Sequence, residues 1–419
     1  MDRFVIHGGR RLEGRVTAAS AKNAVLPILA ACLLTDEECV IRGVPRLEDV
    51  ATMARLLETM GVEVAWRGRT VRLRAGRVSE RAPYDIVRKM RASYYVLGPL
   101  VGRLGRAEVS LPGGCAIGAR PVDLHLKGIE ALGAEVRVEH GYIKARARKL
   151  RGAGMVLEGT NGPSVGATAN TMMAAVLAQG ITEIRGAACE PEVADLAAFL
   201  NRMGARVEGA GTPTVRVRGV SRLRGAEHRP IPDRIEAGTL AVAAAMTRGQ
   251  VEIRNCRPDH LGVVIETLRA TGAEVTARRT SLAVSGPGRP GPVIIGTAPY
   301  PGFPTDLQAQ FTALLCLARG TSVVTESIFE NRFLHAMELA RMGAQIEVTG
   351  RTAVIKGVAR LQSAQVMASD LRASAALVLA GLVARGETVV RRIYHLDRGY
   401  ERLEQKLAGL GARIERLAE

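Results

Sequence analysis

One pattern of apolar and polar positions recurs six times along the chain. Its first copy is Leu-Glu-Thr-Met-Gly-Val-Glu-Val at residues 57–64, where a helical run ends at a glycine and an alternating run begins. The glycines that mark the copies follow one another at intervals of about 70 residues. They are Gly61, Gly133, Gly204, Gly272, Gly343 and Gly411. Spacing this even indicates six copies of one structural unit.

Each copy is predicted to form a helix, a short strand, a second helix and a hairpin of two strands, which is an α/β (α+β) fold. In the last copy, residues 373–384 are apolar and rich in helix formers, 387–391 alternate as a strand does, and 400–410 have helical periodicity. Glycine after each helix is the expected left-handed cap. The hairpin strands alternate apolar with basic or small residues, which is typical of sheets with one solvated face. They include Val71–Arg74, Tyr142–Ala145, Val215–Arg218, Leu282–Ser285 and Ala353–Lys356.

The sixth copy stops at the C-terminus without its closing strand. Residues 3–8 (Arg-Phe-Val-Ile-His-Gly) resemble 352–357 (Thr-Ala-Val-Ile-Lys-Gly), so we expect the N-terminal strand to pair with the C-terminal one. Two lobes of three copies follow, one at 21–229 and the other at 230–419 together with 1–20. The proline-bearing stretch 228–233 is the predicted crossing point. Two connecting strands would permit the lobes to close over a ligand.

The charge, the aromatic content and the cysteines of the chain limit the kinds of ligand and the cell compartment that we expect. The chain has 419 residues, enough for a large core, and its net charge of +17 suggests anionic partners such as phosphates, carboxylates or nucleic acid. Only 3% of the residues are aromatic, so a surface that stacks bases is poorly supplied. Its apolar runs are too short to span a bilayer and the N-terminus lacks a signal core. The six cysteines form no CxxC pair. We therefore expect a cytoplasmic protein with free thiols, without a metal, a cofactor, a membrane contact or an obligate protein partner.

Cys115 is the first candidate for chemistry. It lies in a glycine-rich stretch, residues 111–124, and Arg120 follows closely enough to favour the thiolate or to bind an anion. The segment between the first strand and the second helix is several residues longer in this copy than in the others. Insertions that a repeat does not need are common places for function. The alternative interpretation is a small buried cysteine in a turn.

Polar residues also gather where the first helix of each copy begins. Helix starts present unpaired N–H groups and a positive dipole end, so several starts at one cleft would make an anion site. Lys22, Arg91 and Arg372 oppose the dipole, which favours a bound phosphate, whereas Ser164, Thr305 and Ser369 could simply be N-caps. The residues at these starts are Lys22, Asn23, Arg91, Ser93, Ser164, Val165, Gly166, Glu236, Thr305, Asp306, Ser369, Asp370 and Arg372.

Two carboxylates and two further arginines belong to the same expected cleft. Arg332 and Arg398 lie in the loops that correspond to the Cys115 loop. Asp306 has no cation next to it in the sequence, so it is the preferred general base. The alternative is that both carboxylates merely neutralise neighbouring arginines, above all Asp370, which stands two residues from Arg372. His125 and His395 are interpreted as bystanders.

With these residues assembled, the whole chain resembles the bacterial UDP-N-acetylglucosamine enolpyruvyl transferases. The matching segments are 18–24, 111–125, 301–308, 329–333, 369–373 and 393–401. The resemblance implies a two-lobed inside-out α/β barrel, with three repeats per lobe, helices buried and sheets outward. It also implies transfer of the enolpyruvyl group of phosphoenolpyruvate to the 3-hydroxyl of UDP-N-acetylglucosamine by addition and elimination. Phosphate is released, and the resemblance implies that this reaction is the first committed step of peptidoglycan synthesis.

The resemblance assigns roles to particular residues. Cys115 would transfer a proton to phosphoenolpyruvate and could add to it covalently, which would also make it the target of the epoxide fosfomycin. Asp306 would be the base at the sugar hydroxyl, and Lys22, Arg120 and Arg398 would hold phosphoenolpyruvate. The nucleotide sugar would lie on Asn23, Arg91, Arg120, Pro121, Val122, Asp123, Leu124, Ser164, Val165, Gly166, Asp306 and Ile328. Arg332, Asp370 and Arg372 complete the predicted substrate-binding set.

Three other functions stay open on the sequence. A shikimate-pathway enolpyruvyl transferase resembles this architecture, but that family is not built around a cysteine like Cys115. A catalytically silent nucleotide-sugar-binding regulator would not need Cys115, Asp306, Lys22 and Arg398 together. A nucleic-acid binder would account for the charge, but the basic residues are dispersed along the hairpin strands rather than bunched.

Overall fold

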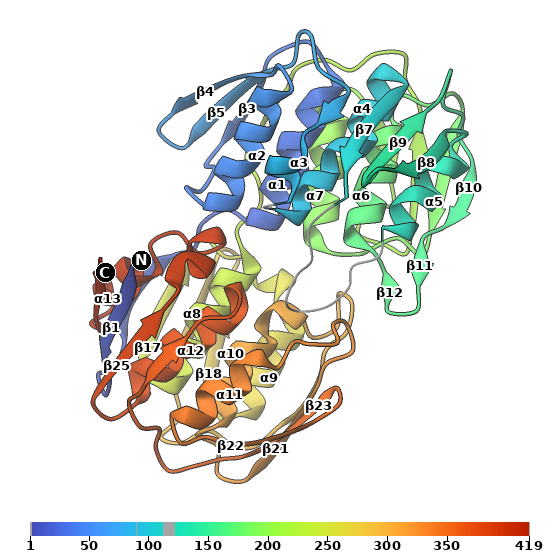
Figure 1. Cartoon of the computed structure of the whole chain (residues 1–419). Helices are drawn as coiled ribbons and strands as arrows, with labels where there is room; N and C mark the ends of the chain where they lie inside the picture. The colour runs from blue at the N-terminus through green and yellow to red at the C-terminus, as the bar shows by residue number, and fades with distance from the viewer. Residues whose placement is uncertain (1, 89, 112–121, 419) are drawn as a thin grey trace. The chain divides into compact units, whose positions relative to one another are not determined.

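The structure is a computed structural model that describes residues 2–88, 90–111 and 122–418. Within these ranges the chain divides into two compact units (Figure 1). Unit I begins at Ser20 and ends at Ile231. Unit II contains the N-terminal residues up to Ala19 and the chain from Pro232 onward.

Unit I contains three copies of the repeat. Its helices are α1 (Lys22–Ala31), α2 (Glu48–Thr59), α3 (Tyr84–Val87), α4 (Leu97–Leu104), α5 (Asp123–Ala131), α6 (Val165–Ala175) and α7 (Pro191–Arg202), with 3-10 helices η1 (Cys32–Leu34) and η2 (Arg91–Val96). Its strands are β3 (Cys39–Arg42), β4 (Glu63–Arg67), β5 (Thr70–Arg74), β6 (Arg81–Ala82), β7 (Arg106–Ser110), β8 (Glu135–Glu139), β9 (Tyr142–Arg146), β10 (Gly154–Val156), β11 (Glu158–Gly159), β12 (Gly162–Pro163), β13 (Ile181–Arg185), β14 (Arg206–Glu208), β15 (Thr214–Arg218) and β16 (Glu227–His228).

Unit II contains the other three copies. Its helices are α8 (Arg234–Met246), α9 (Gly262–Ala270), α10 (Thr305–Leu315), α11 (Leu334–Arg341), α12 (Leu371–Val383) and α13 (Leu403–Gly409), with 3-10 helices η3 (Pro258–His260) and η4 (Ile393–Arg398). Its strands are β1 (Arg3–His7), β2 (Glu13–Thr17), β17 (Gln250–Arg254), β18 (Glu274–Ala277), β19 (Ser281–Ser285), β20 (Ile294–Gly296), β21 (Thr321–Thr325), β22 (Gln345–Thr349), β23 (Thr352–Lys356), β24 (Gln365–Met367), β25 (Glu387–Arg391) and β26 (Arg413–Leu417).

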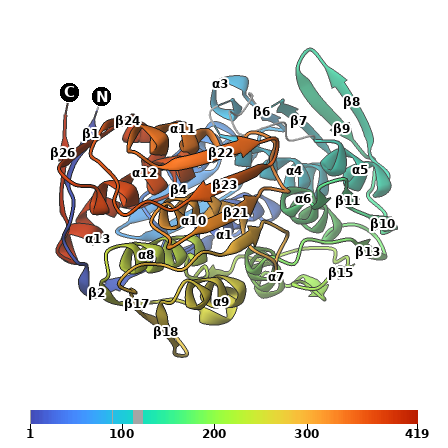
Figure 2. The ribbon, with the colours of Figure 1, turned by 90° about the horizontal axis from the view of Figure 1, so that it is seen from below.

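One strand order recurs in the four-stranded sheets of both units. An edge strand runs parallel to the first strand of a copy, which then pairs antiparallel with the hairpin, as in the order β10-β13-β15-β14. The same order gives β16-β3-β5-β4 and β6-β7-β9-β8 in unit I. In unit II it gives β20-β21-β23-β22, whose hairpin strands lie side by side in Figure 2. The prediction of a repeated helix–strand–helix–hairpin unit is confirmed.

The N-terminal strand closes the last copy, as predicted. In β1, Arg3 pairs with Leu417 and His7 pairs with Arg413 of the antiparallel strand β26. Its other edge pairs with β25, with Phe4 opposite Val390. The two ends of the chain therefore share the sheet β24-β25-β1-β26, as the neighbouring N and C labels of Figure 1 show.

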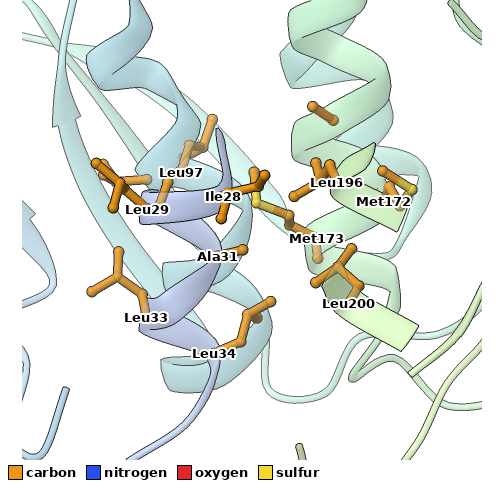
Figure 3. Packing of buried hydrophobic residues seen from close by; sticks show 14 of the residues in the cluster. Ile28, Leu29, Ala31, Leu33, Leu34, Leu97, Met172, Met173, Leu196 and Leu200 are labelled. Carbon is orange, nitrogen blue, oxygen red and sulfur yellow. The ribbon is translucent and has the colours of Figure 1, made fainter. Parts of the chain in front are cut away.

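Helices fill the interior of each unit and sheets cover it, which is the inside-out α/β barrel. Helices α1, α6, α8, α10 and α12 are buried along almost their whole length, and a helix that is apolar all round is stable only when covered on every side. In unit I, Ile28 of α1, Met173 of α6 and Leu196 of α7 meet in this core (Figure 3). Among the described residues no helix is long and apolar enough to cross a membrane.

The six marker glycines all have a left-handed backbone. Their φ angles are 95° at Gly61, 91° at Gly133, 100° at Gly204, 91° at Gly272, 85° at Gly343 and 99° at Gly411. Residues with a side chain rarely adopt this conformation, so glycine is needed at each of these helix ends. The prediction of glycine caps is confirmed.

Two helix boundaries differ from the prediction. Helix α13 begins at Leu403 rather than at residue 400, because Arg402 has a φ of 47° and the preceding turn is the 3-10 helix η4. The second copy also begins with a 3-10 helix, η2, before α4. Both segments carry predicted site residues, namely Arg398 in η4 and Arg91 in η2.

Replacing Gly98 with alanine should destabilise unit I. A Cβ at Gly98 in α4 would lie 2.2 Å from the backbone oxygen of Asn170 in α6. Backbone atoms cannot move aside as a side-chain end can, so we expect a loss of about 1–3 kcal/mol in the free energy of unfolding, despite the better helix propensity of alanine. Urea unfolding measures it. Gly76→Ala is the control, because a Cβ there meets nothing within 4 Å.

Candidate active site

A charged cluster in unit II is centred on Asp306, in the first turn of α10. The Oδ1 atom of Asp306 accepts a hydrogen bond from Nη2 of Arg332 at 2.8 Å, and its Oδ2 atom accepts one from Nη2 of Arg372 at 2.9 Å. The two arginine side chains are only 3% and 5% exposed, whereas that of Asp306 is 26% exposed. Two buried cations therefore orient an ionised carboxylate that solvent still reaches.

Arg372 has a second contact that fixes its position. Its guanidinium carbon lies 5.4 Å from the ring centroid of buried Tyr400, within cation–π range. Burial alone would lower the pKa of Arg372, but the charge of Asp306 and the influence of Tyr400 raise it above its ordinary value. Arg372 thus stays charged inside the protein, as a partner for an anionic side chain requires.

A hydrogen-bonded network continues beneath this cluster. Nε2 of Gln310 donates to the backbone oxygen of Asp306 at 3.0 Å and to the hydroxyl of Tyr400 at 3.0 Å. The Tyr400 hydroxyl is also 2.8 Å from Oγ1 of Thr239 in α8. Burial raises the pKa of Tyr400, so the phenol stays neutral at physiological pH. The network joins α8, α10 and the segment after η4 around Asp306.

The structure gives both carboxylates partners that the sequence did not identify. Asp306 has no cation beside it in the sequence, yet it is the carboxylate that both arginines bind. Asp370 caps α12 instead of neutralising the Arg372 side chain, because its Oδ1 accepts the backbone N–H groups of Arg372 at 2.9 Å and Ala373 at 3.0 Å. Ser369 is not the cap of this helix.

Two histidines in unit II have pKa values that Asp370 influences. His335 of α11 is fully buried, and burial lowers its pKa to about 4, while Asp370 opposes the shift and Arg332 adds to it. His395 of η4 also has a lowered pKa, chiefly because of burial and then because of Arg398. Asp370 opposes the lowering of the pKa at both histidines but does not outweigh burial. The charges of Asp370, Arg332 and Arg398 therefore influence the same pair of histidines in unit II.

In unit I, Lys22 occupies the start of α1 as predicted. Its Nζ atom lies 3.0 Å from Oδ2 of Asp49, and the two side chains are 12% and 6% exposed. Asn23 follows in the first turn of the helix and is half-buried. The sequence interpretation missed Asp49. Asp49 lies in the first turn of α2, where an acidic residue usually does no more than interact favourably with the helix dipole.

The start of α6 is built around Ser164. Its side chain accepts the backbone N–H of Ala167, so the N-cap alternative is confirmed for this serine. Val165 and Gly166 form the first turn and are half-buried. A Cβ at Gly166 would lie 2.8 Å from the ring of His125, so this ring packs directly on the helix start.

His125 is positioned by a residue that the sequence interpretation missed. Its Nδ1 atom is 2.9 Å from Nδ2 of Asn170, and its ring lies 5.7 Å from that of Tyr94. Burial lowers the pKa of His125 to about 4, so the ring is neutral and its Nδ1 accepts the Asn170 hydrogen bond. Asn170 also accepts the backbone N–H of Gly98, which ties this histidine to α4.

Several predicted site residues lie outside the residues that the structure describes, or next to that boundary. Cys115, Arg120 and Pro121 fall outside the described residues, and Arg91 is described by its backbone alone. Val122 and Leu124 are half-buried around exposed Asp123, the first residue of α5. In unit II, Ile328 is half-buried in the loop after β21.

The remaining sequence expectations concern metals, thiols and charge. No group of three or more possible metal ligands occurs among the described residues. Cys32, Cys39, Cys189, Cys256 and Cys316 are free thiols. Glu236, which the pattern placed at an anion site, pairs instead with Lys406 at 2.5 Å inside unit II.

Comparison with known proteins gives a family. The family described as EPSP synthase (3-phosphoshikimate 1-carboxyvinyltransferase) matches residues 6–407. A protein named UDP-N-acetylglucosamine 1-carboxyvinyltransferase from Trichlorobacter lovleyi is 54% identical over 421 residues, and one of the same name from Anaeromyxobacter sp. is 58% identical over 422 residues. Both alignments cover 100% of each chain.

Solved structures agree on the fold. The enolpyruvyl transferase NikO from Streptomyces tendae has a TM-score of 0.90 at 25% identity, covering 100% of this chain and 99% of its own. An EPSP synthase from Acinetobacter baumannii has a TM-score of 0.75 at 18% identity, covering 100% of both chains, and shares the fold. By full-length sequence and by fold, the chain belongs to the enolpyruvyl transferase family, among the UDP-N-acetylglucosamine 1-carboxyvinyltransferases.

Proposed function

We propose that this protein transfers the enolpyruvyl group of phosphoenolpyruvate to the 3-hydroxyl of UDP-N-acetylglucosamine and releases phosphate, the committed step of peptidoglycan synthesis. The observation that carries the proposal is the identity of 58% over the full length to a relative named for this reaction. The charged cluster at Asp306 supports it, because the reaction needs a base held near cations.

The reaction consists of an addition and an elimination. In the addition, the 3-oxygen of the sugar bonds to C2 of phosphoenolpyruvate, the hydroxyl proton passes to a base, and C3 takes up a proton from an acid. In the elimination, C3 loses a proton, the double bond forms again, and the bond from C2 to the phosphate oxygen breaks. Phosphate carries away the electron pair of that bond.

Asp306 is the proposed base. Arg332 and Arg372 hold its carboxylate in one orientation, which removes the need to order it when the substrate arrives. Its exposure of 26% lets a hydroxyl approach. Ile328 belongs to the proposed sugar-binding surface of unit II, and Asp370 belongs to the proposed substrate-binding set.

The other roles rest on the family resemblance. Cys115 is the proposed acid at C3, and Lys22, Arg120 and Arg398 are the proposed ligands of phosphoenolpyruvate. In unit I, the proposed nucleotide-sugar contacts are Asn23, Arg91, Pro121, Val122, Asp123, Leu124, Ser164, Val165 and Gly166. The reaction is proposed to occur in the cytoplasm.

An acceptor assay tests this function. The purified protein should release phosphate from phosphoenolpyruvate when UDP-N-acetylglucosamine is present and should not when shikimate 3-phosphate replaces it. Phosphate release and mass spectrometry of the nucleotide product measure the outcome. Release with shikimate 3-phosphate alone would support the sister activity. Absence of release with both acceptors would support a nucleotide-binding regulator without catalysis.

A further inference from the structure

Glu326 is a fully buried carboxylate directly after β21, and four donors surround it. Its Oε1 atom accepts hydrogen bonds from Oγ1 of Thr297 at 2.9 Å, from the backbone N–H of Ile328 at 2.8 Å and from that of Phe329 at 3.2 Å. Its Oε2 atom accepts one from Oγ1 of Thr305 at 2.8 Å. All four donors are neutral, so the carboxylate is solvated by fixed dipoles of the protein.

Three of the four donors belong to segments that carry part of the candidate site. Thr305 immediately precedes Asp306 and is the first residue of α10. Its hydroxyl donates to Glu326 rather than serving as the helix cap, so the N-cap interpretation of Thr305 is wrong. Glu326 therefore fixes the backbone from which the Asp306 side chain extends.

The two backbone donors lie in the loop that leads to Arg332. The Arg332 guanidinium lies 5.2 Å from the ring centroid of Phe329, and the N–H of Phe329 points to Glu326. Ser327 is held in the same loop, because Thr297 accepts the N–H of Ser327 at 2.9 Å. One carboxylate thus joins the segment that bears Asp306 to the loop that bears its partner Arg332.

We propose that Glu326 is a positioning residue for the transfer reaction, which sets the relative geometry of Asp306, Arg332 and Ile328 through Thr305 and the backbone of residues 328 and 329. This inference rests on the proposed function. Glu326 touches neither substrate nor reacting atoms in this scheme and acts through the groups it holds. A side chain with fewer acceptor sites would leave buried donors unpaired and would let the loop and the helix start move apart.

The effect of Glu326 should fall on the sugar side of the reaction. Asp306 and Ile328 are the proposed sugar contacts in unit II, so the variant Glu326→Gln should lower kcat and raise the KM for UDP-N-acetylglucosamine. Together we expect a loss of about ten- to a hundredfold in kcat/KM, because small displacements of reacting groups have effects of this size. The KM for phosphoenolpyruvate should stay within about twofold of wild type. A general loss of folded protein would instead lower the apparent kcat and leave both KM values unchanged.

A matched control exists in the same unit. Glu347 of β22 is exposed and lies outside every segment assigned to the site. Glu347→Gln removes a carboxylate of the same chemistry, and its kinetics should equal those of wild type. Thermal melting of both variants separates a kinetic effect from loss of folded enzyme.

A double-mutant cycle tests the path through Thr305. If Glu326 acts on Asp306 through this hydroxyl, Thr305→Val and Glu326→Gln together should be no slower than the slower single variant. If the fold-losses in kcat of the two single variants multiply in the double variant, the path through Thr305 is overturned. Wild-type kinetics of Glu326→Gln would overturn the proposal as a whole.

A crystal structure of Glu326→Gln keeps the test independent of activity. The proposal expects the contact of Arg332 Nη2 with Asp306 Oδ1, 2.8 Å in the wild-type chain, to lengthen or break. An unchanged contact overturns the positioning role. If the wild-type protein releases no phosphate with either acceptor, the proposed function fails, and this structural result still decides what Glu326 holds in place.

Discussion

Replacing Asp306 with asparagine should lower kcat by about a thousandfold, the largest catalytic effect we expect of any substitution in unit II. An amide cannot take the proton of the sugar hydroxyl. Its NH₂ group would also face one of the guanidiniums of Arg332 and Arg372, which now donate to the two carboxylate oxygens. Phosphate release at saturating phosphoenolpyruvate and UDP-N-acetylglucosamine measures the change.

The control for this prediction is Asp259→Asn. Asp259 belongs to η3 of the same unit and pairs with Arg257 at 2.6 Å on the surface, so its loss should leave kcat unchanged. Melting curves are needed, because the Asp306 variant also leaves two buried arginines beside a neutral partner. A folded Asp306→Asn protein that keeps a tenth or more of the wild-type kcat would exclude Asp306 as the base.

The sequence predicted the architecture well because the signals for it are local. Helical periodicity, alternation in the hairpins and a left-handed glycine such as Gly61 each depend on a few adjacent residues. The pairing of β1 with β26 was also predictable. Residues 3–8 resemble residues 352–357, which supply a hairpin strand in the fifth copy, and the sixth copy lacks the equivalent strand. Repetition of the pattern predicted two features that one copy alone could not, namely the six structural units and the closing of the sixth by the N-terminal strand.

The partners of the site residues were not predictable in the same way. Arg332 and Arg372 lie 26 and 66 residues from Asp306, and adjacency in the sequence suggested Asp370 as the partner of Arg372 instead. A carboxylate two residues before an arginine can pair with its side chain or cap its helix, and only packing decides between the two.

Buried polar residues were missed for a related reason. Asp49, Asn170, Gln310 and Glu326 each lie in an ordinary helical or strand pattern, and their types alone indicate solvent-facing positions. What distinguishes them is the set of hydrogen bonds that they make to distant segments. The role of Cys115 remains a prediction of the sequence and the family resemblance.

The largest effect on stability should follow from removing Lys406. Glu236 of α8 is 2% exposed, and its Oε1 atom pairs with Nζ of Lys406 at 2.5 Å while its Oε2 atom accepts the N–H of Ala19 at 2.6 Å. Lys406→Met leaves this carboxylate buried without its cation. We expect a loss of about 3–5 kcal/mol in the free energy of unfolding at neutral pH, measured by urea denaturation. Lys356→Met, on the exposed face of β23, is the control and should have little effect.

The dependence on pH and a second substitution show whether charge is the cause. Burial raises the pKa of Glu236 above its ordinary 4.5, and Lys406 opposes this shift. Because the folded state then binds the proton more tightly than the unfolded state, the stabilisation from protonating Glu236 is complete below pH 4.5 and is lost as the pH rises through the folded-state pKa. Without Lys406 that pKa lies higher still, so the deficit of Lys406→Met should shrink on acidification. Adding Glu236→Gln should restore most of the loss at neutral pH, because it removes the unpaired charge. A deficit that is constant with pH and unchanged in the double variant would attribute the loss to packing of the lysine chain instead.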